Sequence, residues 1–196
     1  MRRPVKIALL AVAALALLGA LLLWSAVRRG FSTHDEPSRM EAWVARNARH
    51  WSAPADLRDA RNPLPLTPQV MSEARAHWAD HCASCHGNDG KGKTAVGEKL
   101  YPRAPDMTLP ATQTLSDGEL FAIIENGVRL TGMPGWGNGT AESAYGSWTL
   151  VHFIRHLPEL SPEEIAGMEA LNPKTPEEWE ELQAEEAFLS GETHQH

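Results

Sequence analysis

The sequence predicts an all-α protein. Alternation of apolar and polar residues typical of strands is scarce, while 15 glycines and 14 prolines divide the 196 residues into short segments. Several segments open with a helix-start signal, a Ser or Thr followed by Pro or by an acidic residue three positions later. These starts are Thr67-Pro68, Ser116–Glu119, Ser161–Glu164 and Thr175–Glu178. We expect short helices joined by loops, with one much longer helix at the N-terminus.

Residues 7–27 form an apolar run of 21 residues with basic residues on both sides, Arg2, Arg3 and Lys6 before it and Arg28 and Arg29 after it. A helix rises about 1.5 Å per residue, so the run is long enough to cross a bilayer. A cleavable signal peptide is the alternative, but Trp24 is too bulky for the expected cleavage site. We favour an uncleaved transmembrane anchor over residues 1–29; either interpretation exports the rest of the chain.

Residues 30–66 predict an amphipathic helix followed by a tether. Between Glu36 and Trp51, apolar residues recur near helical spacing. The apolar positions are Met40, Trp43, Val44 and Ala48, and the basic ones are Arg39, Arg46, Arg49 and His50. Two roles remain open for this helix: lying on anionic headgroups, or packing against the following domain or a partner. Residues 52–66, with Pro54, Pro63 and Pro65, predict an extended tether.

Charge is distributed unevenly along the chain. Residues 1–63 carry a net charge of +5 and residues 64–196 a net charge of −12. An acidic exported portion argues against nucleic acid as a partner and favours basic protein surfaces. The acidity is greatest in residues 159–196, predicted to be a helical tail, where eleven acidic residues accompany one basic residue. This tail is either a solvated acidic surface or a docking surface for a cationic redox partner.

The stretch Cys82-Ala83-Ser84-Cys85-His86-Gly87 contains the only two cysteines of the chain. Two cysteines three positions apart, followed at once by histidine, form the pattern that attaches a c-type haem. On a helical turn both thiols reach the two vinyl groups of one porphyrin edge, and His86 lies beneath the iron. A redox dithiol lacks the expected βαβ context here, and a zinc site lacks a second ligand pair. We therefore predict one covalent haem c, with His86 as an axial ligand.

Helix signals surround this motif. The helix that starts at Thr67 is expected to reach about Asp80, and the capped helix at Ser116 to end at Gly127. A last helix contains Trp148 to Leu157 and ends at Pro158. Together these helices predict a haem domain over residues 67–158.

Met133 is the candidate for the second axial ligand. It lies between Gly132 and Pro134, in a loop where a methionine is poorly placed to fill a core. A thioether ligand completes a His/Met iron and raises its potential. The rivals are Met107, Met168, His152 and His156, and a bis-His or open site is the alternative.

The chain resembles a class I monohaem cytochrome c from the helix before Cys82 to His156. The resemblance rests on Cys82–His86 and on Leu115-Ser-Asp-Gly-Glu-Leu-Phe-Ala-Ile-Ile-Glu-Asn-Gly127, continued by Met133-Pro-Gly-Trp136. This pattern is similar to the haem domains of bacterial oxidase subunits and of alcohol-dehydrogenase cytochrome subunits. The resemblance implies that Ala74 and Trp78 lie where the first helix crosses the last. It also implies that Pro105 packs against the haem face that carries the axial histidine.

The expected function is that of an electron carrier rather than an enzyme. The resemblance implies attachment to the bacterial inner membrane with the haem domain facing the periplasm, and redox protein partners whose identity the sequence does not give. The alternatives are a haem-based gas sensor, a peroxidase-like enzyme, or a fixed cytochrome subunit of an oxidase or dehydrogenase complex. The terminal His194-Gln195-His196 is either a weak copper or zinc chelator or a solvated end.

Overall fold

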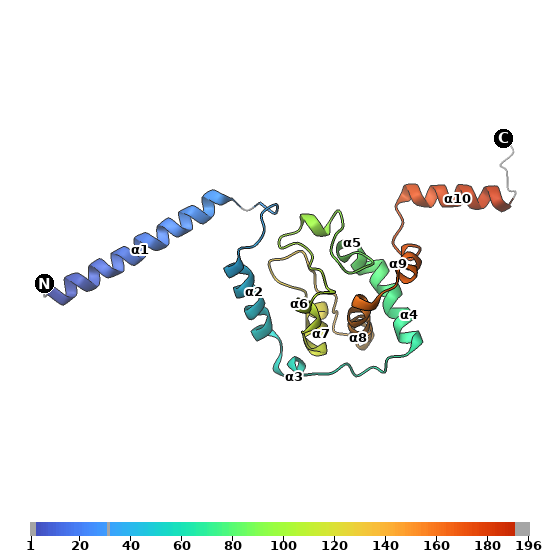
Figure 1. The fold of residues 1–196 in the computed structure, drawn as a ribbon, viewed down its shortest axis with the longest axis horizontal. Coiled ribbons are helices and arrows are strands. Elements are labelled where there is room, and N and C mark those ends of the chain that lie inside the picture. Colours follow the sequence, from blue (N-terminus) through green and yellow to red (C-terminus); the bar gives the residue numbers. More distant parts are fainter. Residues whose placement is uncertain (1–2, 31, 191–196) are drawn as a thin grey trace. The chain divides into compact units, whose positions relative to one another are not determined.

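A computed structural model of the chain describes residues 3–30 and 32–190, which form two compact units, Met1–Asp35 and Glu36–His196 (Figure 1). The two units are described separately. The expectation of an all-α fold is confirmed, because every regular element in the described residues is a helix. The histidines of the C-terminal His194-Gln195-His196 lie outside the described residues.

The first unit is built on one helix, α1 (Arg3–Arg29). Its mean hydropathy reaches 2.7 over an 18-residue window, and none of that window is buried inside the protein. By length and composition α1 is able to cross a membrane. Near its C-terminal end the Arg28 guanidinium lies 5.4 Å from the Trp24 ring centroid.

The second unit contains the remaining helices, several of which begin as the sequence predicts. Thr67, Ser116 and Ser161 each accept a backbone hydrogen bond at the start of a helix, and Ser116 and Ser161 form complete capping boxes. The Glu178 amide likewise donates to the Thr175 hydroxyl, and the Thr175 amide donates to the Glu178 carboxylate. The elements in order are α2 (Arg39–Ser52), α3 (Ala55–Arg58), α4 (Pro68–His77), η1 (Trp78–Cys82), α5 (Ala83–His86), η2 (Gly97–Lys99), α6 (Pro110–Gln113), α7 (Asp117–Asn126), α8 (Ala141–His156), η3 (Leu157–Glu159), α9 (Pro162–Glu169) and α10 (Pro176–Ser190).

The core lies where α4 meets α8, with α7 and α9 contributing side chains. Ala74 of α4 is fully buried, and Trp78, at the start of η1, lies 5.2 Å from the ring of Phe153. The small residue lets the two backbones approach, while the indole fills the crossing. This arrangement is the helix crossing that the resemblance implies. The chain therefore uses Trp78 as a packing residue.

Two helix boundaries differ from the predicted ones. Helix α8 begins at Ala141, about two turns before Trp148, because the Thr140 side chain accepts a hydrogen bond from the Ser143 backbone and caps the helix there. Helix α4 ends at His77, and the chain continues as the π-helical turn η1, in which the Ala83 amide donates to the Trp78 carbonyl.

Residues 52–66 differ from the free tether that the prolines predict. They contain the short helix α3, and the chain beyond it is bonded to α7 and α8. The Gly118 amide donates to Ala60 O (3.1 Å), and the Asn62 amide nitrogen Nδ2 donates to Trp148 O (2.8 Å). An added Cβ at Gly118 would collide with the Leu57 carbonyl, so this close approach requires glycine. The prolines make the segment extended, and these bonds hold it in place. The boundaries predicted for the four regions of the chain remain predictions.

Candidate functional site

The two cysteines and His86 lie on consecutive short helical turns. Cys82 is the last residue of η1, and Cys85 and His86 belong to α5, which ends at Gly87 with a φ of 75°. Trp78 braces this segment from the core side. Its Nε1 donates to the Gly87 carbonyl (3.0 Å), and its ring centroid lies 5.8 Å from that of His86. The hydrophobic core thus fixes the orientation of the cysteine-histidine motif.

The backbone carbonyls of this motif are satisfied by the loop that follows. Thr94 Oγ1 lies 2.9 Å from Ser84 O and 3.2 Å from Cys85 O, and the Gly92 amide donates to His86 O (2.8 Å). Thr94 also accepts from the Gly97 amide (2.8 Å), so one hydroxyl joins the motif to the loop. Thr94 was not predicted from the sequence, because a lone threonine in a glycine-rich loop gives no distinctive signal.

The surroundings of the Cys82 thiol help to distinguish haem attachment from a redox dithiol. Burial, together with the neighbouring Cys85, raises the pKa of the Cys82 thiol to about 12. A redox-active Cys-x-x-Cys pair has a lowered thiol pKa, so the environment of Cys82 argues against a redox dithiol. Both cysteines are free. Over residues 3–30 and 32–190, no group of three or more His, Cys, Asp and Glu side chains is placed to hold a metal ion, and nothing there favours zinc.

His86 has the properties required of an axial ligand. Burial lowers the pKa of its imidazole, so the ring is held in the neutral form that coordinates iron. Its Nδ1 is buried and has no hydrogen-bond partner among the described residues. A buried neutral imidazole directly after two free thiols fits the covalent attachment of a haem c.

Met133 lies in a loop that closes on itself beyond α7. The Val128 amide donates to Met133 O (3.0 Å), and the Met133 amide donates to Thr131 Oγ1 (3.1 Å). The Trp136 amide donates to Ile124 O (3.0 Å), which fixes the far side of the loop to α7. Gly127 begins the loop with a φ of 65°, and a Cβ there would lie 2.5 Å from the Gly135 amide nitrogen.

One ring contact joins this loop to the cysteine-histidine motif. The His81 ring, next to Cys82, lies 5.3 Å from the ring of Trp136, three residues after Met133. Segments that are about fifty residues apart in sequence therefore meet beside the two cysteines.

The rivals of Met133 are engaged elsewhere. Met107 and Met168 are 8% and 0% exposed and belong to the hydrophobic core, whereas Met133 is half-buried and lies outside it. His152 Nε2 bonds to Leu64 O (2.9 Å), and His156 Nε2 bonds to the Glu164 carboxylate (3.1 Å).

Pro105, expected to contact the haem face, is exposed on a loop held against the residues after His86. Before Pro105 in the sequence, the Ala104 amide donates to Gly97 O (3.0 Å), and after it the Met107 amide donates to Gly90 O (2.9 Å). A Cβ on Gly92 would collide with the Ala104 carbonyl, so the two loops lie in contact. Contact between Pro105 and a haem remains a prediction.

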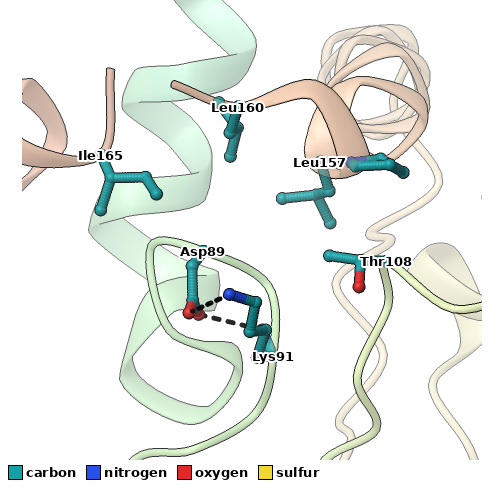
Figure 2. A pocket seen from close by; sticks show the side chains of 7 residues that line it. Asp89, Lys91, Thr108, Leu157, Leu160 and Ile165 are labelled. Carbon is teal, nitrogen blue, oxygen red and sulfur yellow. Dashed lines mark hydrogen bonds and ion pairs between the residues drawn. The ribbon is translucent and has the colours of Figure 1, made fainter. Parts of the chain in front are cut away.

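A surface cleft of about 320 Å³ lies beside this site. Figure 2 shows the Asp89–Lys91 ion pair on one side and the apolar side chains Leu157, Leu160 and Ile165 opposite. Neither the cysteines, nor His86, nor Met133 line it. The cleft marks where α9 and η3 cover the loop after His86, outside the cysteine-histidine motif.

Comparison with known families agrees with this geometry. Residues 69–154 match the family described as cytochrome C oxidase, cbb3-type, subunit III. The matched segment runs from α4 to near the end of α8 and contains the cysteine-histidine motif and Met133. The match supports a c-type cytochrome haem domain in this part of the chain. Such a domain supports haem-based electron transfer, either as a carrier or as part of an oxidase.

Proposed function

We propose that the protein carries single electrons through one covalently bound haem c, with His86 and Met133 as the two axial ligands. In this proposal α1 anchors the protein in the bacterial inner membrane, and the haem domain faces the periplasm. Once bound, the haem supplies a one-electron iron couple. The donor and the acceptor are redox proteins.

The observation that carries the proposal is the contact between His81 and Trp136. It supports the proposal because it brings Trp136, in the loop of Met133, against His81, the residue before Cys82. Each residue then has a distinct role: Cys82 and Cys85 hold the porphyrin edge, and His86 supplies a fixed nitrogen ligand. Met133 supplies a thioether, which favours the reduced iron and raises the potential.

The surroundings of the motif support a carrier that changes little in structure when it is oxidised. The backbone of the motif is bonded on one side to Trp78 and on the other to Thr94. A backbone held in this way keeps His86 at a constant orientation whichever charge the iron carries. Core packing behind Trp78 also keeps water from the imidazole side of the site.

The test is the spectrum of the haem-loaded protein. We expect a low-spin spectrum with the far-red band of methionine-to-ferric-iron charge transfer. That band should be lost in Met133→Ala and retained in Met107→Ala, in which a core methionine is truncated. A high-spin resting spectrum in the wild-type protein would instead indicate a gas sensor or a peroxidase-like enzyme.

The family match favours a second candidate, a fixed cytochrome subunit of a larger oxidase complex. Gentle solubilisation of the membrane followed by native separation distinguishes the two. A free carrier migrates at its own size, and a fixed subunit co-migrates with a larger enzyme.

A further inference from the structure

Helix α2 packs against the haem domain through its polar side. Ala42, Arg49 and Ala53 are half-buried on this side. The Tyr101 hydroxyl donates to Glu41 Oε1 (2.6 Å), and His50 Nδ1 lies 2.6 Å from Glu119 Oε1. Burial raises the pKa of Glu119, but hydrogen bonds from Ser116 and His50 outweigh it, so the net pKa is lowered and the carboxylate stays charged.

The opposite side of α2 is apolar and exposed. Met40, Trp43, Val44 and Trp51 are 77%, 57%, 51% and 68% exposed, and their spacing of three, four and seven residues places them on one side of the helix. A surface helix normally buries its apolar side and exposes its polar side. Helix α2 does the reverse, so its apolar side is available for a partner outside the described chain.

We propose that this apolar side of α2 lies in the headgroup region of an anionic bilayer, the same membrane that α1 crosses. The inference depends on the anchoring role proposed for α1. Nine residues, 30–38, separate α1 from α2. At about 3.3–3.6 Å per residue a fully extended connection spans about 35 Å, so the bilayer surface is within the reach of α2.

The composition of α2 fits this location. Tryptophan is enriched at membrane interfaces, where its apolar ring and polar N–H are both accommodated. The exposed Arg39 and Arg46 give α2 positive charge that complements anionic lipid headgroups. At the end of α1, Trp24 and Arg28 form another pair of interfacial residue types.

Docking through α2 fixes the haem domain on the membrane. The polar side of α2 is bonded to Tyr101 and Glu119, and residues 57–64 are bonded to α7 and α8. The haem domain therefore does not swing on a loose tether. It moves in the plane of the membrane with one side toward the lipid.

Photo-crosslinking of the full-length, haem-loaded protein tests this inference. In the first variant p-benzoylphenylalanine replaces Val44, on the apolar side. In the matched control it replaces Ala45, which is also exposed but points away from the apolar side. Both proteins are reconstituted into phosphatidylethanolamine vesicles containing phosphatidylglycerol. We expect several-fold more lipid adduct at position 44, and a lower yield when phosphatidylcholine replaces the phosphatidylglycerol.

Equal adduct yields at positions 44 and 45, or a crosslink from position 44 to a second copy of the chain, would overturn the docking. Carbonate extraction and the haem spectrum of the same vesicles separate this failure from that of the proposed function. If the protein resists extraction and retains its spectrum, a missing adduct refutes the docking alone. If carbonate removes the protein, both the anchor and the docking are wrong.

Discussion

The cysteine-histidine segment, residues 78–97, and the methionine loop, residues 127–137, are held in place by different means. The first is fixed from two sides, by the buried Trp78 and by the Thr94 hydroxyl. The second is held mainly by its own hydrogen bonds and by backbone bonds to α7. Leu130, at the tip of the methionine loop, is 92% exposed and has a φ of 63°. The proposed haem attachment thus depends on the core, whereas the proposed distal ligand depends on a surface loop.

The largest effect should follow from removing both thiols. In Cys82→Ser/Cys85→Ser no thioether bond forms, so we expect haem staining of the denatured protein to be lost completely. Ser84→Ala, on the exposed residue between them, is the control and should keep its covalent haem. Covalent haem in the double variant would contradict the assignment of these cysteines.

The next effect should come from the packing behind the motif. Trp78→Ala removes a side chain that is 1% exposed, and we expect a loss of about 3–5 kcal/mol in the free energy of unfolding. Chemical denaturation measures it. Trp136→Ala in the methionine loop truncates an indole that is 38% exposed. It should lower the free energy of unfolding clearly less than Trp78→Ala does. Equal losses would mean that the two regions are equally rigid.

A smaller loss is expected at the start of the methionine loop. Gly127→Ala places a Cβ close to the Gly135 amide, at a φ of 65° and a ψ of −169° that glycine adopts far more readily than alanine. The conformation alone costs about 1–3 kcal/mol, and the contact adds to that cost. We expect this loss in denaturation, together with a weaker far-red band because the loop shifts. An unchanged stability would show that the loop adapts freely.

The smallest effect should be that of Leu130→Gly. Glycine removes the strain of the left-handed conformation but increases the entropy of the unfolded chain, and the two terms nearly cancel, to within about 1 kcal/mol. The exposed leucine contributes no core packing. A large loss of stability would show that Leu130 makes a contact that its exposure does not suggest.

Local sequence signals predicted much of the fold. Ser116 and Ser161 begin helices as predicted, since a cap depends on residues only three positions apart. The Cys82–His86 motif was likewise predicted from residues that lie close together in the sequence. Thr140 escaped prediction because no proline follows it directly and Ser143, not an acidic residue, stands three positions later.

Long-range contacts account for what the sequence did not predict. The prolines of residues 52–66 indicate an extended chain, but only the tertiary structure shows Asn62 bonded to Trp148. The role of Thr94 depends on carbonyls ten and nine residues earlier in the chain. The proximity of His81 to Trp136 joins residues that no local pattern connects.

The π-helical turn at Trp78–Cys82 sets how far the cysteine-histidine motif is rotated about the helix axis relative to α4. It contains one residue more per turn than an α-helix would. Deleting the exposed Asp80 would turn α4 by about 100° relative to Cys82. Trp78 could then no longer reach Phe153 and the Gly87 carbonyl together. The chain thus tolerates substitutions at Asp80 more readily than the loss of the residue, and a deletion there separates haem attachment from core packing.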